Sequence, residues 1–351
     1  MSERTAPAAA GGTAAGRRRQ AVMADVAAIA GVSQMTVSRV LNDRPGVGET
    51  TRERVLAAMR EVDYRPNVAA RTLVTGRSRT LGVVTFDSTL YGPASTLYGI
   101  ELAARHAGYY VTVSTLPAFD DRAVVEAVDR LREQVIDGVV AIAPNDGSTT
   151  AVRDALTHEL PFVAIEGGDE RELCVVSIDQ TTGARRATRH LLSLGHETVW
   201  HIAGPGDWRV SGERTAAWRA VLEEEGREVP EPLVGDWSAR SGYQHGTELA
   251  TRDDVTAVFA GNDQMALGVL RAFSEAGRPA PRHVSVVGFD DLPESGYFIP
   301  PLTTVRQNFG DVGRRSLQLL LAQLESGRPT PGRTLVEPEL VLRESTGRRP
   351  G

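Results

Sequence analysis

Residues 25–42 read DVAAIAGVSQMTVSRVLN, two short helical stretches on either side of one glycine, Gly31. Glycine permits the left-handed backbone conformation that a tight turn between two helices requires. Val32 can fill the small core beside this turn, and the hydroxyl group of Ser33 can cap the second helix. This turn chemistry, together with the cap and a basic local charge, favours a helix-turn-helix over a generic amphipathic helical hairpin.

The residues around this motif continue the helical pattern from about Met23 to Tyr64. The apolar positions expected to form its core are Val26, Ile29, Val37, Val40, Val55, Leu56 and Met59. A third helix is predicted to begin at Thr50, where Thr50 and Glu53 have the spacing of a capping box. Val22 stands where a hydroxyl cap of the first helix would be expected, which predicts some fraying there.

The second helix of such a motif places its first residues in the major groove of DNA. We expect base edges to be reached by Gln34, Met35 and Arg39, and capping or phosphate contacts to be made by Ser33, Thr36 and Ser38. The amide of Gln34 suits adenine and the guanidinium of Arg39 suits guanine, whereas Met35 offers only an apolar contact, for instance to a thymine methyl group. These residues predict sequence-specific binding to double-stranded DNA.

Charge is unevenly distributed along the 351 residues, whose net charge is −6. Residues 1–80 hold 13 arginines and 7 acidic residues, a balance of +6, which leaves −12 on the rest of the chain. A basic head on an acidic body predicts that only the head meets a polyanion. The basic residues are all arginines, whose guanidinium groups suit bidentate contacts with phosphate or guanine.

Several functional classes are disfavoured by the composition. Apolar runs such as Leu81 to Phe86 are far too short for a bilayer of roughly 30 Å, and Met1 to Gln20 lacks the apolar stretch of a secretory signal, so we expect a cytoplasmic protein with no membrane partner. The single cysteine, Cys174, excludes an intrachain disulfide and a cysteine cluster. The seven histidines lack metal-binding spacing, and no nucleophile elbow or Walker loop is present, so we expect no metal, no cofactor and no enzyme.

From Leu81 onward, short β-rich runs alternate with amphipathic helical stretches. The predicted strands cover 81–86, 110–115, 138–143, 162–166, 175–178, 199–203, 257–260 and 284–289, with a last one near 339–342. Predicted helices include 121–133, 181–194, 213–225 and 264–276. This alternation predicts parallel α/β sheets with crossover helices. About 265 residues exceed what one sheet usually holds, so we expect two lobes with a ligand in the cleft between them.

The chain resembles the lactose-repressor (LacI-type) family of bacterial transcription regulators from about Val22 to Leu342. The resemblance is carried by residues 25–42, by YRPN at 64–67 and, in the body, by GDWS at 235–238, NDQMALG at 262–268 and IPPLTT at 299–304. It implies an all-α helix-turn-helix head plus an α/β two-lobed periplasmic-binding-protein-like sensor domain. The function implied is a sequence-specific repressor whose operator affinity is controlled by a small-molecule effector.

The resemblance and the residue patterns together predict four parts of the chain. These are a flexible arm (1–20), a helix-turn-helix DNA-binding domain (21–65), a hinge helix and linker (66–79) and a ligand-sensing domain (80–346). The first lobe of the sensor is expected to take residues of about 80–178 and 308–336, and the second lobe 179–307 and 337–346.

The resemblance also implies that Asn67 to Val74 is a hinge helix that folds when a dimer sits on its operator. By matching position, Leu73 would be an apolar wedge in the minor groove, where unstacking a base step is offset by a larger contact surface. Asn67 and Ala70 would line the same groove. The other role open to Leu73 is packing of one hinge helix against its partner, and both roles can hold at once.

Sugar sites combine an aromatic face with planar polar groups that grip hydroxyl pairs. Residues of these types near predicted strand ends are Asp87, Glu166, Arg214, Trp237, Asn262 and Asp290. The resemblance adds Gln307 and the wall residue Phe309, and it matches Arg214, Trp237, Asn262, Asp290 and Gln307 to inducer-binding positions of the family. Each has a structural alternative: an ion pair for Arg214, lobe core for Trp237, a helix cap for Asn262 and a turn for Asp290.

The effector implied by the resemblance is a sugar, with a β-galactoside acting as inducer as the nearest candidate. A corepressor-dependent regulator of the same fold is the alternative. A sugar-binding transport protein is a third possibility, but such a protein would need an export signal and would have no use for a DNA-binding head. Because Glu344 to Gly351 is polar and too short for two heptads, we expect a homodimer. Its two recognition helices would bind a pseudopalindromic operator.

Overall fold

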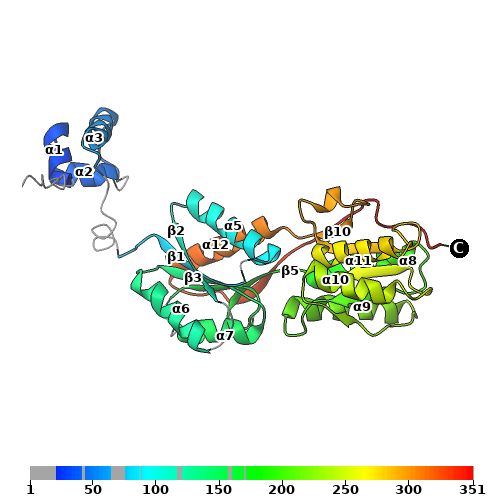
Figure 1. Cartoon of the computed structure of the whole chain (residues 1–351). Helices are drawn as coiled ribbons and strands as arrows, with labels where there is room; N and C mark the ends of the chain where they lie inside the picture. The colour runs from blue at the N-terminus through cyan, green and yellow to red at the C-terminus, as the bar shows by residue number, and fades with distance from the viewer. Residues whose placement is uncertain are drawn as a thin grey trace, which may run out of the picture. The chain divides into compact units, whose positions relative to one another are not determined.

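The computed structural model describes residues 21–41, 44–64, 76–87, 89–116, 121–156, 160–169 and 171–350. The chain divides into two compact units, with the boundary between Ser78 and Arg79 (Figure 1). The predicted arm (1–20) and the predicted hinge residues Asn67, Ala70 and Leu73 lie outside the described residues. None of the helices in the described ranges has the length and apolar character needed to cross a bilayer.

Within its described residues, the first unit contains three helices: α1 (Met23–Ala30), α2 (Gln34–Leu41) and α3 (Glu49–Glu61). Gly31 ends α1 in the left-handed conformation with a φ of 63°, as a turn between two helices requires. The Oγ atom of Ser33 accepts a hydrogen bond from the backbone N–H of Thr36 at 3.2 Å, which caps α2. The predicted helix-turn-helix is therefore confirmed, including its turn residue and its cap.

The ends of α1 and α3 differ from the sequence-based expectation. A carboxylate oxygen of Asp25 accepts a hydrogen bond from the backbone N–H of Val22 at 2.9 Å, so an acidic side chain in the first turn serves where a hydroxyl cap was missing. Helix α3 begins at Glu49 after an extended Gly48, so the capping box predicted at Thr50 is wrong. The guanidinium of Arg54 donates to the carbonyl oxygen of Ala30, the last residue of α1.

The core of the head is built from smaller side chains than predicted. Val26, Val37, Val40 and Val55 are buried as expected, together with three alanines, Ala27, Ala30 and Ala58. Ile29 is 46% exposed and Leu56 is 40% exposed, so their assignment to the core is wrong. Alanines take inner positions, where their small side chains allow the helices to pack closely.

The second unit contains two six-stranded sheets. The first has the strand order β11-β5-β4-β3-β1-β2, formed by β11 (Gly332–Val336), β5 (Cys174–Ile178), β4 (Phe162–Glu166), β3 (Gly138–Ala143), β1 (Thr80–Phe86) and β2 (Tyr110–Leu116). Its helices are α5 (Tyr91–His106), α6 (Asp121–Glu133), α7 (Asp146–Ala155) and α12 (Phe309–Ser326). Figure 1 shows α5 and α12 on one face of this sheet and α6 and α7 on the other.

The second sheet has the order β12-β10-β9-β8-β6-β7, formed by β12 (Glu339–Val341), β10 (Thr303–Arg306), β9 (Ser285–Asp290), β8 (Ala257–Ala260), β6 (Trp200–Ala203) and β7 (Leu233–Val234). Its helices are α8 (Gln180–Ser193), α9 (Arg209–Glu224), α10 (Ala239–Leu249) and α11 (Asp263–Glu275), and a short 3-10 helix covers Ser295–Tyr297. Among the pairings of the described strands, β10 with β12 is antiparallel and the others are parallel. The predicted two-lobed α/β body is confirmed.

Parallel strands that are covered on both faces need apolar side chains on both sides. The strand β3 shows this most clearly, because its sequence GVVAIA is buried at all 6 positions. Separate apolar clusters fill the two faces of each sheet. The chain passes between the sheets after β5, after β10 and after β11, and these three crossover segments border the carboxyl ends of the strands.

Candidate functional site

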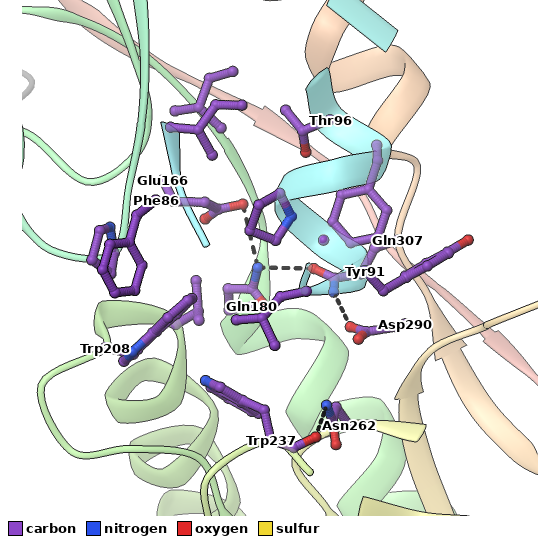
Figure 2. Close-up of a pocket in the computed structure, with 18 of the residues that line it drawn as sticks. Phe86, Tyr91, Thr96, Glu166, Gln180, Trp208, Trp237, Asn262, Asp290 and Gln307 are labelled. Carbon is purple, nitrogen blue, oxygen red and sulfur yellow. Dashed lines mark hydrogen bonds between the residues drawn. The ribbon is translucent and has the colours of Figure 1, made fainter. Parts of the chain in front are cut away.

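A cavity lies in the second unit, where the carboxyl ends of parallel strands from both sheets face each other (Figure 2). It encloses about 780 Å³, part of it open to solvent. Phe86 and Glu166 reach it from the ends of β1 and β4, while Asn262 and Asp290 reach it from the ends of β8 and β9. A cleft at this edge of parallel sheets is the usual position of a ligand in α/β proteins.

The structure gathers most of the ligand-binding residues predicted from the sequence. The lining of the cavity includes Glu166, Arg214, Trp237, Asn262, Asp290, Gln307 and Phe309. Asp87 is not among the described lining residues; a carboxylate oxygen of Asp87 instead accepts a hydrogen bond from the backbone N–H of Thr89 at 3.1 Å. This local turn explains the difference, because an aspartate directly after a strand can bind the backbone two residues further on.

A chain of hydrogen bonds runs across the cavity between two carboxyl groups. Nε2 of Gln180 lies 3.5 Å from Oε1 of Glu166 and donates to Oε1 of Gln307 at 3.0 Å. Nε2 of Gln307 then donates to Oδ1 of Asp290 at 2.5 Å. Gln180 begins α8 after the first crossover and Gln307 lies in the second crossover, so this chain joins the segments that connect the two sheets.

Arg214 of α9 supplies a buried positive charge beside this chain. Its Nε donates to Oε1 of Gln180 at 2.9 Å and its Nη1 donates to the carbonyl oxygen of Gly261 at 2.5 Å. The guanidinium carbon lies 3.9 Å from the centre of the Phe289 ring, a cation–π contact. These partners hold the guanidinium in one orientation, which a planar group needs in order to grip a pair of ligand hydroxyls.

The two carboxyl groups of the cavity are unusually weak acids. The pKa of Glu166 is raised to about 7, mainly by burial and in part by the neighbouring Glu213, while the backbone N–H of Ile178 and the charge of Arg214 oppose the rise. Burial raises the pKa of Asp290 to about 6, opposed by Arg214 and by the amide of Gln307. Near neutral pH these groups can therefore either donate or accept a hydrogen bond.

Trp237 and Asn262 form the wall contributed by the second sheet. Oδ1 of Asn262 caps α11 by accepting from the backbone N–H of Met265 at 2.9 Å, and its Nδ2 donates to the carbonyl oxygen of Trp237 at 3.0 Å. The helix-cap alternative for Asn262 is therefore real, but the same residue lies on the cavity wall. Asn262 thus fixes the backbone that presents the indole ring of Trp237.

The backbone is strained at several of these positions. Glu166, Trp237 and Asp290 have φ values of 66°, 69° and 115°, in the region that glycine normally occupies. Such conformations persist where the surrounding structure imposes them, and they cluster at functional sites.

In the parts of the chain that are described, no group of three or more histidine, cysteine or acidic side chains is placed to hold a metal ion.

The first unit presents a second candidate surface at the beginning of α2. Met35 is 67% exposed, and Gln34 and Arg39 are also exposed. The side-chain oxygens of Ser33 and Thr36 lie 3.0 Å apart and hydrogen bond to each other. The three predicted base-reading side chains are thus accessible, while the hydroxyl groups of Ser33 and Thr36 stiffen the first turn of the helix.

Comparison with known proteins places both surfaces in one family. Residues 22–67 match the family model for bacterial regulatory proteins of the lacI family, and residues 188–346 match the periplasmic binding protein-like domain. The lactose operon repressor of Escherichia coli (strain K12) is 35% identical over 323 residues, which cover 92% of this chain and 89% of the relative. The chain belongs to the lacI family of bacterial regulatory proteins.

Solved structures of lacI-family members agree with this assignment. A structure of the lac repressor dimer bound to operator and the anti-inducer ONPF is 35% identical with a TM-score of 0.84, covering 94% of this chain and 100% of that chain. A complex of the transcriptional regulator CelR with cellobiose is 31% identical with a TM-score of 0.70, covering 93% and 100%. The chain is a DNA-binding transcription repressor with an effector-sensing domain, and these relatives are regulators rather than enzymes.

Several cavity residues of this lacI-family member were not predicted from its sequence. They include Phe86, Tyr91, Gln180 and Trp208. Tyr91 packs edge-on against Phe309, with ring centres 5.7 Å apart. Gln180 directly follows the strand-end pair Ile178-Asp179, so the rule that located Glu166 and Asp290 could have found it. No sequence pattern marks Trp208 as a cavity residue. It stands at the N-terminal end of α9, where its side chain forms no helix cap.

Proposed function

We propose that this chain is a homodimeric repressor of a pseudopalindromic operator and that a sugar, with a β-galactoside as the first candidate, induces release from DNA. The observation that carries the effector class is the cavity itself. The indole of Trp237 and the planar polar groups of Arg214, Asn262 and Gln307 line it together. An aromatic face for C–H surfaces next to fixed planar donors and acceptors suits a ring bearing several hydroxyl groups. The relatives bound to operator and ONPF and to cellobiose support the same reading.

The proposed DNA contacts follow the geometry of the helix-turn-helix. Gln34, Met35 and Arg39 read base edges in the major groove, and Ser38 contacts the phosphate backbone together with the first turn of α2. The minor-groove contacts are assigned by resemblance to Asn67, Ala70 and Leu73, which lie outside the described residues. The protein acts in the cytoplasm, where its operator is.

The proposed boundaries of the parts are an arm (1–20), the DNA-binding domain (21–65), the hinge and linker (66–79) and the sensor (80–346). Within the sensor, the first lobe comprises about 80–178 and 308–336, and the second 179–307 and 337–346. Coupling arises because the effector contacts Gln180 and Gln307 on two of the crossover segments. A ligand that binds one arrangement of the lobes more tightly shifts the protein toward that arrangement. Operator affinity then rises or falls by the free energy that couples the two binding sites.

The test is fluorescence anisotropy of a labelled DNA fragment selected by the full-length protein from a random library. Galactosides, glucosides and purines are added in turn to the preformed complex. Release by a sugar supports induction, whereas tighter binding in the presence of any compound would show a corepressor instead. A complex that responds to none of the sugars would refute the proposed effector class.

A further inference from the structure

Three aromatic rings form a line along one side of the cavity. Phe86 from β1 and Trp208, which precedes α9, meet edge-on with ring centres 6.0 Å apart at 63°. Trp208 and Trp237 meet in the same manner at 5.8 Å and 72°. Trp208 therefore bridges an aromatic ring of the first lobe and one of the second, as Figure 2 shows.

The indole N–H of Trp237 bears on how firmly this line of rings is held. It is buried and has no hydrogen-bond acceptor among the described residues. In Figure 2 the nitrogen lies on the side of the ring that faces Trp208. The edge-on contact with Trp208 is therefore one of the interactions that hold the indole of Trp237 in place.

Apart from Glu166, which lies near Phe86, the polar side chains labelled in Figure 2 lie away from Phe86 and Trp208. Gln180, Gln307 and Asp290 form their hydrogen-bonded chain on the opposite side from Phe86 and Trp208 (Figure 2). The cavity thus has a polar end that suits a hydroxylated ring and an aromatic end that offers flat apolar faces. A ligand that fills both ends carries two rings. The ring at the aromatic end is bound through an apolar face rather than through hydroxyl groups.

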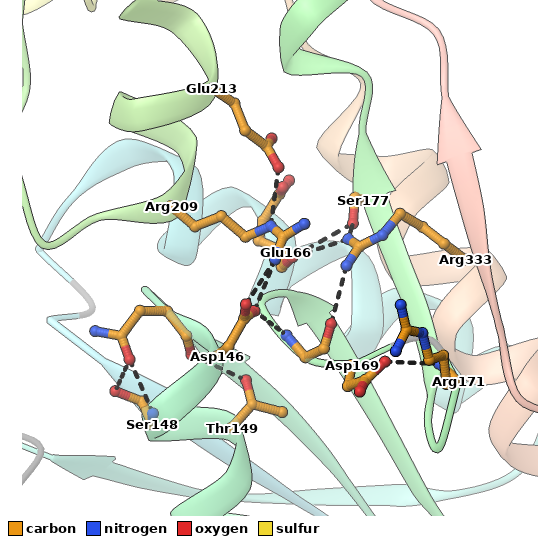
Figure 3. A network of polar contacts seen from close by, with 12 residues as sticks. Asp146, Ser148, Thr149, Glu166, Asp169, Arg171, Ser177, Arg209, Glu213 and Arg333 are labelled. Carbon is orange, nitrogen blue, oxygen red and sulfur yellow. Dashed lines mark hydrogen bonds and ion pairs between the residues drawn. The ribbon is translucent and has the colours of Figure 1, made fainter. Parts of the chain in front are cut away.

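The segment that carries Trp208 is tied to the opposite lobe. The backbone N–H of Arg209 donates to the carbonyl oxygen of Pro144 at 2.9 Å, and Nδ2 of Asn145 lies 3.3 Å from the carbonyl oxygen of Asp207. Nη1 of Arg209 also contacts both carboxylate oxygens of Asp146, at 2.9 and 2.7 Å (Figure 3).

Both partners of the Arg209–Asp146 ion pair make further hydrogen bonds that hold them in place. Asp146 accepts a hydrogen bond from the backbone N–H of Gly168 at 2.7 Å, and Nε of Arg209 donates to Glu213 at 2.8 Å. The side chain of Asp146 is 56% exposed, so solvent screens the ion pair and it adds little to the stability of the fold. Its consequence is geometric: it fixes the residue next to Trp208 against the first lobe.

We propose that Trp208 is a specificity-determining residue that selects effectors with a second ring, glycosyl or aryl, and that the Arg209–Asp146 bridge is the pair that positions it. This inference rests on the proposed sugar-sensing function. The ring nearest Arg214 and Asn262 is recognised through its hydroxyl groups. The second ring packs against the faces of Trp208 and Phe86.

The test is calorimetric titration of the full-length protein with galactose and glucose, with lactose and cellobiose, and with the o-nitrophenyl β-glycosides. The disaccharides and the aryl glycosides distinguish a glycosyl from an aryl second ring. The variants are Trp208→Ala, Trp208→Phe, Arg209→Gln and Asp146→Asn. The matched control is Arg185→Gln, because Arg185 is similarly shielded and pairs with Glu224 at 2.5 Å on the surface of the second lobe.

We expect Trp208→Ala to weaken binding of two-ring ligands about tenfold or more and to leave monosaccharide binding nearly unchanged, since it removes one apolar wall. Trp208→Phe should restore most of this preference. Arg209→Gln and Asp146→Asn should reduce the preference for two rings in the same direction, whereas Arg185→Gln should not. The measured quantity is the ratio of affinities, which a merely structural role would not change.

A wild-type protein that binds monosaccharides as well as two-ring ligands would overturn this inference, as would a Trp208→Ala variant that weakens both classes equally. In either case the sugar-sensing function would stand. A wild-type protein that binds none of these sugars would instead refute the proposed function itself, and this inference with it.

Discussion

Gln180 and Gln307 come from two different crossover segments and are hydrogen bonded to each other, with Nε2 of Gln180 donating to Oε1 of Gln307 at 3.0 Å. Each amide is also engaged at its other end, because Oε1 of Gln180 accepts from Arg214 and Nε2 of Gln307 donates to Asp290. Neither side chain can turn without breaking two bonds. A ligand in contact with this pair therefore acts on two of the three connections between the lobes at once.

Replacing Gln307 by leucine, a side chain of similar size, tests this coupling. The change removes the hydrogen bonds that Gln307 makes with Gln180 and with the buried carboxyl group of Asp290, and a buried polar group left unsatisfied costs about 1–3 kcal/mol. We expect effector affinity to fall about tenfold or more, measured by calorimetry, with a smaller change in operator affinity without effector. The exposed Gln318→Leu on α12 is the control. An unaltered effector affinity in Gln307→Leu would contradict the role assigned to this residue.

The raised pKa of Glu166, about 7 in the folded protein, predicts a pH dependence of stability. Its folded pKa exceeds its unfolded value, so its contribution to the unfolding free energy is present at low pH and is lost as the pH rises through about 7. Glu166→Gln mimics the protonated acid at every pH. Melting temperatures of this variant and the wild type should agree near about pH 4, and the variant should be more stable by about 1–3 kcal/mol near about pH 8.

The variant must be compared with the wild type at each pH, because other buried groups change the stability with pH in the opposite direction. Burial lowers the pKa of His201 to about 4, so its contribution to stability is lost as the pH falls. Subtracting the wild-type curve removes that background. The exposed Glu325→Gln should follow the wild type throughout. A constant difference between Glu166→Gln and the wild type across this pH range would disprove the assignment of Glu166 as a buried acid.

The sequence predicts most strands of both sheets, including the edge strands β2 and β12, but it misses β7, β10 and β11. β3 and β4 have the predicted limits, because both are apolar on both faces and bounded by turns. β11 was missed, since it lies at the edge of its sheet and Leu335 is 51% exposed, which leaves no apolar run to detect. A strand of this kind is determined by its pairing with a neighbour rather than by its own side chains.

The candidate site was predicted in part for a related reason. Polar residues at strand ends were found, because the carboxyl edge of a parallel sheet is where ligands bind. Asp87 met the same criterion, yet its side chain turns back to Thr89. Trp208 was missed, because its position depends on tertiary contacts such as the Arg209–Asp146 bridge. The left-handed backbone of Trp237 likewise has no sequence pattern, since tryptophan rarely adopts it.

Arg39 on α2 tests the DNA-reading surface. If its guanidinium reads guanine, Arg39→Ala should weaken binding to the selected operator by about 1–3 kcal/mol, and binding to random-sequence DNA should change much less. Anisotropy titrations on both DNAs at several salt concentrations provide the measurement. Equal losses on the two DNAs would show instead that Arg39 contacts only phosphates, in which case the salt dependence would also decrease.

Gly204, at the end of β6, tests the position of Trp237 from behind. A Cβ atom at residue 204 would lie 2.1 Å from two carbons of the indole ring, so Gly204→Ala must displace the ring. Trp237 packs in the core of the second lobe, and overpacking of this kind costs about 1–3 kcal/mol. We therefore expect a lower melting temperature and an effector affinity reduced by about tenfold or more, because the aromatic wall is moved. Gly206→Ala is the matched control two residues away, where an added Cβ meets nothing within 4 Å, and it should retain both properties. If Gly204→Ala bound the effector as tightly as Gly206→Ala, the ring of Trp237 could not be the wall against which the sugar packs.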